Sequence, residues 1–287
     1  MRKMLLYTAI FALLLTSVSC CNNNTNSEQE NNSDSLQIVT LTPSITKQLL
    51  LLGLEDNVIG HTSFCPSDKL VNSELVASAA EVNVEKIAVL DPDIVLVSTL
   101  TKEKVIKNLR KVGVEVKYLD MPRSFDEICG QMIKLGELLD KKDKAAKIVA
   151  RQRKRLDSLR HTIPESEKVK FLIQIGAKPL YAATSESFMH DYIKYAQGEN
   201  IAAGLSSGTL SRESVLKKNP DVIVIVTMGM AGKEEKEIWQ GYPNLKATKN
   251  DQVHIIDSDE ASSPTPVTFV NVLDTIIEMV YKNDSKH

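Results

Sequence analysis

One pattern of hydrophobic and polar positions occurs twice in the chain. Residues 85–97 (EKIAVLDPDIVLV) contain a short amphipathic segment, an Asp-Pro step and an apolar run, and residues 213–225 (ESVLKKNPDVIVI) repeat a glutamate, a proline and an aspartate at the same spacing. Because the residue before a proline is steered out of the helical conformation, we expect a helix to end at each step. The apolar run that follows is typical of a strand buried on both faces. The repeat therefore predicts two α/β lobes of similar plan.

Strands and helices are expected to alternate in the first lobe. The β-rich runs are 37–42, 58–62 and 114–119, and helices are expected at 43–52, 101–111 and after Ser124. The helix after Ser124 carries an apolar stripe at helical spacing: Ile128, Met132, Leu135 and Leu139. Such alternation predicts a mainly parallel sheet with helices on its faces.

Residues 140–161 form a segment of a different kind. Lysine and arginine dominate it, its apolar stripe is narrow, and no glycine or proline interrupts it. A helix of this length spans about 30 Å, enough to reach from one lobe to the next. The stripe is too thin and too poor in aromatic residues for a membrane-bound helix. We interpret the segment as a solvated structural helix that joins the lobes.

The second lobe is expected to contain strands at 169–175, 180–182 and 253–256, a helix at 188–196, and a closing helix from Pro266. The predicted organisation is therefore a leader, a tether, a lobe, a connecting helix and a second lobe. Their predicted bounds are 1–20, 21–35, 36–139, 140–163 and 164–287.

The first residues read as an export signal. Arg2 and Lys3 precede an apolar stretch too short for a permanent membrane span, and small residues then lead to Cys20. We predict a lipoprotein leader with Cys20 as the acylated residue; Cys21 and an ordinary cleaved signal remain alternatives. The polar stretch 22–35 is expected to be a disordered tether. The predicted location is exported, in the periplasm or cell envelope, with a lipid anchor in the membrane.

The composition bears on three kinds of chemistry: nucleic-acid binding, disulfide bonds and metal binding. The net charge of -2 gives no reason to expect nucleic acid as a partner. Outside the leader only Cys65 and Cys129 remain, and Cys129 on a predicted helix is expected to be a buried thiol, although the pairing stays open. No motif for a metal site is present, since His61 and Cys65 are a lone pair in a loop, and no cofactor is expected.

The sequence also contains one candidate catalytic motif. Residues 204–208 fit the G-x-S-x-G pattern of serine hydrolases around Ser206, with Asp221 and His254 downstream. That motif needs a buried strand directly before it and a packed helix directly after it, and the sequence predicts neither. We therefore expect no enzyme. A nucleotide site at 229–233 is disfavoured as well, because the phosphate-loop spacing is missing.

A binding surface is the remaining prediction. Ligands of open α/β sheets lie beyond the carboxyl ends of the strands, where aromatic and methionine side chains supply apolar area and basic ones meet acidic substituents. The candidate ligand-binding residues at these ends are Thr42, Pro43, Ser44, Phe64, Cys65, Ser98, Thr99, Met121 and Arg123 in the first lobe, and Lys178, Tyr181, Met228 and Asp259 in the second.

These residues carry a family resemblance. The segments 42–46, 60–66 and 83–87 before Pro92-Asp93 resemble the first lobe of periplasmic proteins that bind metal chelates for ABC importers. Gly198-Glu199-Asn200, Ser211-Arg212-Glu213 and the long helix are similar to the second lobe, so the resemblance covers about residues 37–281. It implies an α/β fold of two Rossmann-like lobes joined by a single long rigid helix, with a ligand cleft between the lobes.

The resemblance also implies partners. Glu85 and Glu213 are expected to dock onto arginines of the ABC transporter permease, while the protein itself is a monomer. The segment Phe64-Cys65-Pro66 is similar to the cobalamin-binding branch, which favours a corrinoid, yet the tryptophans usual in that cleft are missing. A ferric siderophore, with Arg123 and Tyr181 as contacts, or haem is the alternative ligand.

Overall fold

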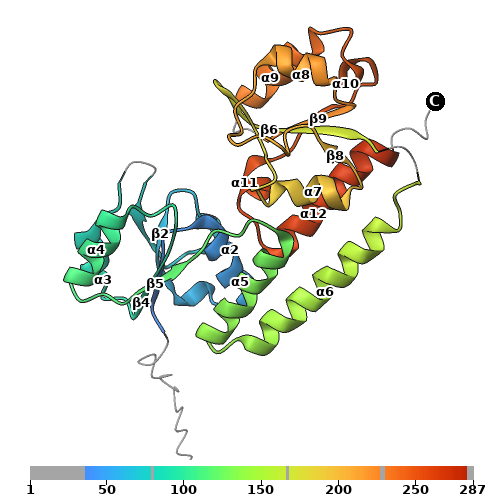
Figure 1. The fold of residues 1–287 in the computed structure, drawn as a ribbon. Coiled ribbons are helices and arrows are strands. Elements are labelled where there is room, and N and C mark those ends of the chain that lie inside the picture. The colour runs from blue at the N-terminus through green and yellow to red at the C-terminus, as the bar shows by residue number, and fades with distance from the viewer. Residues whose placement is uncertain (1–35, 79–80, 166–167, 227–229, 283–287) are drawn as a thin grey trace, which may run out of the picture. The chain divides into compact units, whose positions relative to one another are not determined.

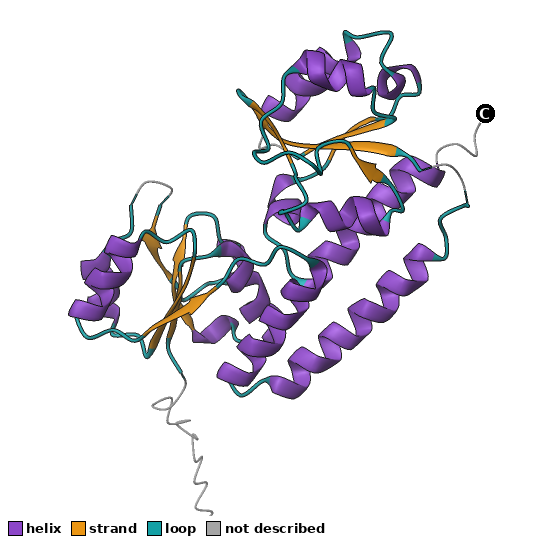
Figure 2. Ribbon diagram, in the orientation of Figure 1, coloured by secondary structure: helices purple, strands orange, loops and turns teal. Residues whose placement is uncertain are grey.

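The computed structural model describes residues 36–78, 81–165, 168–226 and 230–282, and these residues form two lobes, each built on one β-sheet (Figure 1). The predicted leader, the tether, and Cys20 with its alternative Cys21 lie outside the described residues. The mixed α/β, two-lobe fold class predicted from the sequence is confirmed (Figure 2).

The first lobe contains a parallel sheet of five strands in the order β3-β2-β1-β4-β5. Its elements are β1 (Ile38–Thr40), α2 (Pro43–Leu52), β2 (Val58–Thr62), β3 (Glu74–Ala77), α3 (Val84–Leu90), β4 (Ile94–Ser98), α4 (Glu103–Lys111), β5 (Val116–Leu119) and α5 (Phe125–Leu138), with short 3-10 turns at Glu55–Asn57 and Ser67–Lys69. The predicted parallel sheet is confirmed. Strand β3 was not predicted, because its four residues lie among turn-forming residues.

The second lobe contains a five-stranded sheet in the order β10-β9-β6-β7, with β8 also paired to β6. Strand β7 runs antiparallel to β6, and the other pairs are parallel. Its elements are β6 (Lys170–Ala177), β7 (Leu180–Ala182), α7 (Met189–Tyr195), β8 (Glu199–Asn200), α8 (Arg212–Lys218), β9 (Val222–Ile225), α9 (Met230–Gln240), α10 (Lys246–Lys249), β10 (Val253–Ile255), α11 (Ser258–Ser262) and α12 (Pro266–Ile277), followed by a π-helical turn at Glu278–Lys282.

The sequence repeat is a structural repeat with the same hydrogen bonds in each lobe. The carboxylate of Asp93 accepts a hydrogen bond of 2.6 Å from the backbone N–H of Gln37, just before β1. The carboxylate of Asp221 accepts one of 2.8 Å from the backbone N–H of Lys170, the first residue of β6. Each aspartate N–H returns a bond to the carbonyl of the same residue. The aspartate therefore fixes the strand of each repeat beside the central strand of its sheet.

Both repeat helices end where the proline rule predicts, but in a different conformation. Asp91 and Asn219, the residues before the two prolines, have φ values of 49° and 48°, in the left-handed region. Asn and Asp enter that region more readily than other side chains. The helix ends are thus set by a left-handed residue, whereas the rule alone favours an extended one.

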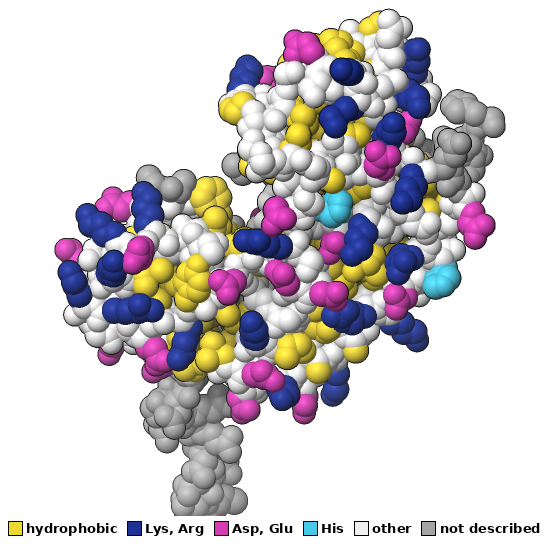
Figure 3. All heavy atoms as spheres, viewed as in Figure 1, with side chains coloured by type: hydrophobic (Ala, Val, Ile, Leu, Met, Phe, Trp, Pro, Cys, Tyr) yellow, Lys and Arg dark blue, Asp and Glu magenta, His cyan; other side chains and the backbone are white. Residues whose placement is uncertain are grey.

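The connecting segment is one helix, α6 (Lys142–Arg160), of 19 residues. Its buried face consists of Ala145, Val149, Gln152 and Leu156, and it packs along α5 and α12 (Figure 1). Charged side chains of both signs cover the neighbouring surface in the space-filling view (Figure 3). Helix α6 is therefore solvated on one side only, and α5 and α12 support its other side.

One hydrophobic core contains residues of both lobes. The ring of Phe269 in α12 lies 4.7 Å from that of Phe125 in α5 and 4.4 Å from that of Tyr192 in α7, centroid to centroid. All three side chains are fully buried, and burial raises the pKa of the Tyr192 hydroxyl far above its ordinary value. These rings join α5, α7 and α12, and with them the two lobes.

The two cysteines of the fold are free and buried. Burial raises the pKa of the Cys129 thiol to about 12, so this thiol is protonated at neutral pH, as expected for a buried thiol.

Within the described ranges, no helix is long and apolar enough to cross a lipid bilayer. The same part of the chain contains no group of three or more His, Cys, Asp and Glu side chains that could hold a metal ion.

The shared aromatic core gives a stability prediction. Replacing Phe269 by alanine removes a ring that three other rings contact, those of Phe125, Tyr192 and Tyr195, so the free energy of unfolding should fall by about 3–5 kcal/mol. Urea unfolding followed by circular dichroism measures this loss. The control is Val89→Ala, because Val89 is 85% exposed on α3 and its change should stay within about 0.5 kcal/mol. Equal losses in both variants would contradict the role given to the core.

Candidate ligand-binding site

A groove of about 980 Å³ lies at the carboxyl ends of the first-lobe strands. Its lining includes Pro43 and Phe64, two of the predicted contacts, together with Leu75 and Leu100. Three of these side chains are large, apolar and exposed: Phe64 by 47%, Leu75 by 51% and Leu100 by 68%. Hydrophobic side chains are visible among charged ones on the surface of this lobe (Figure 3). Exposed apolar area of this kind marks a surface that receives a ligand or a partner.

Four predicted contacts lie beneath this surface. Thr42, Ser44, Cys65 and Ser98 are all buried. The Thr42 hydroxyl donates a hydrogen bond of 2.9 Å to the Ser98 hydroxyl, which in turn accepts one from the Leu100 backbone N–H at 3.3 Å. The Cys65 sulfur lies 3.0 Å from the Thr46 hydroxyl. Thr42 and Ser98 thus tie the loop that carries Leu100, whereas the buried Ser44 hydroxyl has no hydrogen-bond partner among the described residues.

The remaining first-lobe predictions lie nearer the solvent. Thr99 is exposed, and Met121 is half-buried. The guanidinium of Arg123 pairs with the Glu186 carboxylate, just before α7 in the second lobe, at 3.1 Å, and both side chains are largely exposed. Because an exposed ion pair contributes little free energy, Arg123 can exchange this partner for an acidic ligand group at small cost.

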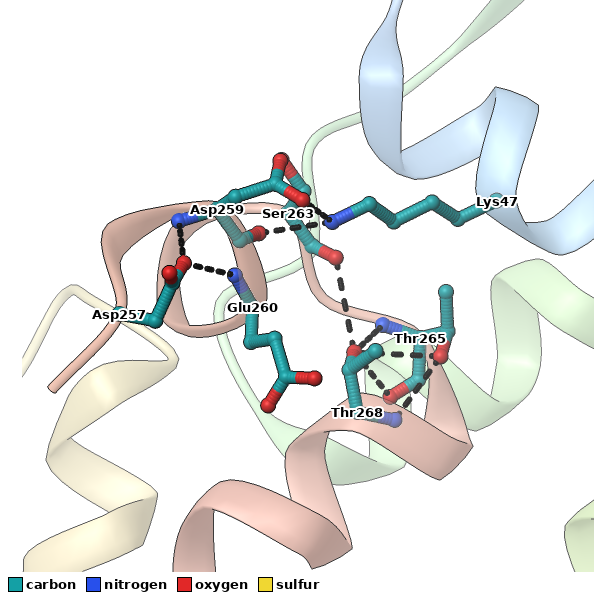
Figure 4. A network of polar contacts seen from close by, with 7 residues as sticks. All are labelled: Lys47, Asp257, Asp259, Glu260, Ser263, Thr265 and Thr268. Carbon is teal, nitrogen blue, oxygen red and sulfur yellow. Dashed lines mark hydrogen bonds and ion pairs between the residues drawn. The ribbon is translucent and has the colours of Figure 1, made fainter. Parts of the chain in front are cut away.

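The second-lobe predictions are more scattered. Lys178 and Tyr181 are exposed in and beside the tight turn between β6 and β7. Met228 lies outside the described residues. Asp259 pairs with Lys47 of α2: the Lys47 ammonium donates hydrogen bonds of 2.8 Å to both the carboxylate and the carbonyl oxygen of Asp259 (Figure 4).

The Lys47–Asp259 pair lies at a second groove. This groove has a volume of about 570 Å³, and Leu50, Leu51 and Val267 contribute to its lining. The first turn of α11 beside it is held by Asp257, whose carboxylate accepts hydrogen bonds from the backbone N–H groups of Asp259 and Glu260 (Figure 4). The structure therefore brings Pro43 and Phe64 together in one groove and places Asp259 at the other.

The two predicted docking carboxylates occupy equivalent places. Glu85 and Glu213 are exposed in the first turns of α3 and α8, two helices of 7 residues. The Asn83 side chain caps α3 by accepting from the Lys86 backbone N–H at 2.8 Å, and the Ser211 hydroxyl caps α8 by accepting from the Ser214 N–H at 3.1 Å. Both carboxylates thus stand at the positive end of a capped helix.

Local hydrogen bonds favour the charged form of Glu213. The backbone N–H of Glu213 itself, and then the Ser211 hydroxyl, hold the pKa of this carboxyl below its ordinary value. Glu213 is therefore ionised at neutral pH and offers an exposed negative charge at the start of α8.

The serine hydrolase alternative is not assembled in the structure. Residues 204–208 lie in turns between the two-residue strand β8 and α8, so the strand-turn-helix arrangement of a nucleophile elbow is missing here. The Asp221 carboxylate is used by the Lys170 N–H, and the His254 ring bonds to Gln252. Ser206 is exposed, and its two candidate partners are bonded to other residues.

Two of the exposed apolar residues that line the groove, Leu75 and Leu100, were not predicted from the sequence as ligand contacts. Leu100 follows the predicted strand at 94–97, and a large apolar residue in such a loop is a signal that was available. Leu75 belongs to β3, which was not predicted, so nothing in the sequence pattern placed it at the groove. A polar cluster around Glu235 and Trp239 was also missed; its members come from three separate segments of the second lobe.

Comparisons with known proteins give a consistent result. Residues 38–260 match the family described as periplasmic binding proteins. A Bacillus subtilis protein named as an uncharacterized ABC transporter substrate-binding lipoprotein is 28% identical over 258 residues, with 87% of this chain and 81% of that protein covered. A vitamin B12-binding protein of Vibrio parahaemolyticus is 25% identical over 248 residues, covering 85% and 87%.

Solved structures resemble the whole fold. A possible iron-binding, periplasmic solute-binding protein of Staphylococcus epidermidis superposes with a TM-score of 0.76 at 25% identity, covering 85% of this chain and 98% of that one. The periplasmic heme-binding protein of Vibrio cholerae superposes with a TM-score of 0.77 at 17% identity, covering 86% and 100%. At the latter identity the likeness concerns the fold alone.

Proposed function

Because the chain belongs to the periplasmic binding protein family, whose members bind substrates and are not enzymes, we propose that it is the substrate-binding lipoprotein of an ABC importer. In this proposal it captures a metal chelate, a corrinoid such as cobalamin, outside the cytoplasmic membrane and delivers it to the permease. The acylated Cys20 anchors the protein to the membrane through the tether at 21–35, and the protein acts as a monomer.

The observation that carries the substrate proposal is the apolar groove of the first lobe. Phe64, Leu75 and Leu100 present three exposed apolar side chains on one lining of about 980 Å³. A corrinoid is a large macrocycle with apolar edges and polar amide side arms. Burying its edges against these side chains removes apolar surface from water, at about 25 cal/mol for each Å². The B12-binding relative from Vibrio parahaemolyticus supports the same ligand class.

Polar residues of both lobes complete the proposed site. Thr99 and Arg123 of the first lobe and Lys178 and Tyr181 of the second are exposed and can meet amide or acidic groups of the ligand. Beneath them, the hydrogen bond between Thr42 and Ser98 holds the loop that carries Leu100, and the Phe64 backbone N–H donates to the Thr62 hydroxyl. We propose that the ligand lies between these two sets of residues, in a cleft between the lobes.

The substrate proposal is tested by calorimetric titration of the soluble part of the chain, from Asn22 onward. Cobalamin, cobinamide, haemin and a ferric siderophore are titrated in turn, and we expect saturable one-to-one binding of the corrinoids. If only haemin or only the ferric siderophore binds, the proposed receptor function stands, but the proposed ligand changes from a corrinoid to that compound. Binding of none of the four would contradict the proposed ligand class.

Variants of the groove sharpen this test. Phe64→Ala and Leu100→Ala should each weaken corrinoid binding by about tenfold, because each removes roughly 1.4 kcal/mol of apolar contact. Val112→Ala is the matched control, since Val112 is 51% exposed at the other end of α4 and should leave the affinity unchanged. An unchanged affinity in both groove variants would place the ligand elsewhere.

The docking proposal concerns Glu85 and Glu213. Two equivalent carboxylates on equivalent helices suit a two-fold symmetric permease with basic pockets. Glu85→Lys and Glu213→Lys should each reduce ligand transport in permease-containing proteoliposomes by tenfold or more. Glu85 also lines the first-lobe groove, so the test that the affinity for the free ligand is unchanged is made on Glu213→Lys. Charge reversal turns an attraction at a partner surface into a repulsion.

A matched control separates docking from a general effect of charge. Asp143 is an exposed carboxylate in the first turn of α6, so Asp143→Lys changes charge in the same helical setting away from both lobes' docking helices. Transport should be normal in this variant. Normal transport in the Glu85 and Glu213 variants would remove the docking role and leave ligand capture untouched.

A further inference from the structure

A buried polar cluster lies directly behind the docking carboxylate of the second lobe. Arg212, the residue before Glu213, donates from Nη2 to both carboxylate oxygens of Glu235 in α9, at 2.9 and 2.7 Å. Glu235 is 2% exposed, so the ion pair is shielded from water on its acidic side. Both bonds come from the same nitrogen, and among the described residues the buried Nη1 of Arg212 has no hydrogen-bond partner. A charge-assisted hydrogen bond of this kind is short and directional.

Two more residues complete this cluster, named here the Arg212 cluster (Gln174, Arg212, Glu235 and Trp239). The Gln174 amide donates to Glu235 Oε2 at 2.7 Å and accepts from the Trp239 ring N–H at 2.7 Å. The Arg212 guanidinium stands 4.7 Å from the centre of the Trp239 ring. Helix α8 is thereby connected to α9 and to β6 through side chains alone.

The backbone before α8 is fixed as well. The Ala182 N–H donates to the Gly208 carbonyl at 2.8 Å, and the Leu210 N–H donates to the Leu180 carbonyl at 3.1 Å. These bonds pair strand β7 with the segment that leads into the Ser211 cap of α8. Neither set of contacts involves the Glu213 side chain, which stays exposed.

The first lobe fixes its docking helix by weaker means. Val84 stands where Arg212 stands in the repeat, and it packs against an apolar core. Lys86, on the other side of Glu85, donates to the Leu75 carbonyl at 3.0 Å and pairs with Glu74 at 2.6 Å, but this pair is exposed. An exposed pair of this kind contributes little, whereas the pair behind Glu213 is buried.

We propose that Arg212 is a positioning residue for docking: held by Glu235, it fixes the first turn of α8 so that Glu213 is presented to the permease in one orientation. The inference rests on the proposed docking function. Removing the arginine leaves Glu235 buried without its cation, and the start of α8 is then held by the Ser211 cap, the buried Val215 side chain and backbone contacts. The Glu213 carboxylate then samples several orientations and binds a basic pocket less tightly.

The test compares Arg212→Met with Arg212→Lys and with the control Lys217→Met, which removes an exposed cation from the last turn of the same helix. Three quantities are measured on the full soluble chain: amide hydrogen exchange of Ser214 to Leu216, affinity for the permease, and affinity for the corrinoid. Trp239, the only tryptophan of the chain, reports the loss of the stacked guanidinium by a change in its fluorescence.

For Arg212→Met we expect exchange in α8 to be at least tenfold faster and the affinity for the permease to fall at least fivefold, with the affinity for the corrinoid within twofold of the parent. Arg212→Lys should recover part of both effects, since lysine restores the charge but not the planar guanidinium that stands over the Trp239 ring. Lys217→Met should change none of these quantities. If Arg212→Met does not fold, Glu235→Gln supplies the same comparison with a neutral side chain of the same shape.

A double variant distinguishes a positioning role of Arg212 from a general loss of structure. In the Glu213→Lys variant, a further Arg212→Met change should not lower the affinity for the permease again, because the group it positions is gone. A full additional loss, or unchanged exchange in α8, would overturn the inference. If Glu213→Lys alone leaves the affinity for the permease unchanged, the docking proposal fails instead, and the exchange data still decide whether Arg212 fixes α8.

Discussion

The contact on which most of the structure depends is the packing of Phe125, Tyr192 and Phe269 in one buried cluster. These rings come from α5 of the first lobe, α7 of the second and α12 at the end of the chain. Among the described residues the buried Tyr192 hydroxyl has no hydrogen-bond partner, which costs about 1–3 kcal/mol that the ring packing must offset. The backbone N–H of Phe125 is also bound by the Asp191 carboxylate at 2.8 Å. The two sheets therefore share one core, and α6 rests on it.

Much of this fold could be predicted, because it is encoded in local patterns. The repeat predicted α3 with β4 and α8 with β9, since an Asp-Pro or Asn-Pro step and a buried apolar run have few other structural solutions. The bounds of β2 and β7 were predicted as the structure has them. Strand β3 was missed because its four residues, Glu74–Ala77, are too few to show the alternation of apolar and polar positions that marks a strand. The place of Trp239 was missed because it depends on Gln174 and Arg212, which are distant in sequence.

The candidate site was predicted less well, for a reason that lies in loop geometry. Parallel strands bring their carboxyl ends to one edge, so the positions of Pro43 and Phe64 near one groove follow from topology. Whether a side chain beyond the last strand residue faces solvent does not follow, since the alternation of faces ends with the strand. Ser98, the last residue of β4, is buried and accepts a hydrogen bond from the Thr42 hydroxyl. Leu100, two residues beyond the end of the strand, is exposed. Hydroxyls at strand ends that can satisfy one another beneath the surface are poor candidates for ligand contacts.

The two repeat helices, α3 and α8, show how one sequence repeat can diverge in its support without changing the exposed carboxylate at its start. Apolar packing, as at Val84, holds a helix against its sheet but is non-directional, so it leaves freedom in the rotation of the helix about its axis. The Arg212 cluster adds directional contacts, because hydrogen bonds to a charged group depend on the angle at which the donor meets the acceptor. A buried ion pair of this kind contributes little net stability once its desolvation is counted. Its effect is then on orientation, which matters most where an exposed carboxylate beside it must meet a partner of fixed geometry.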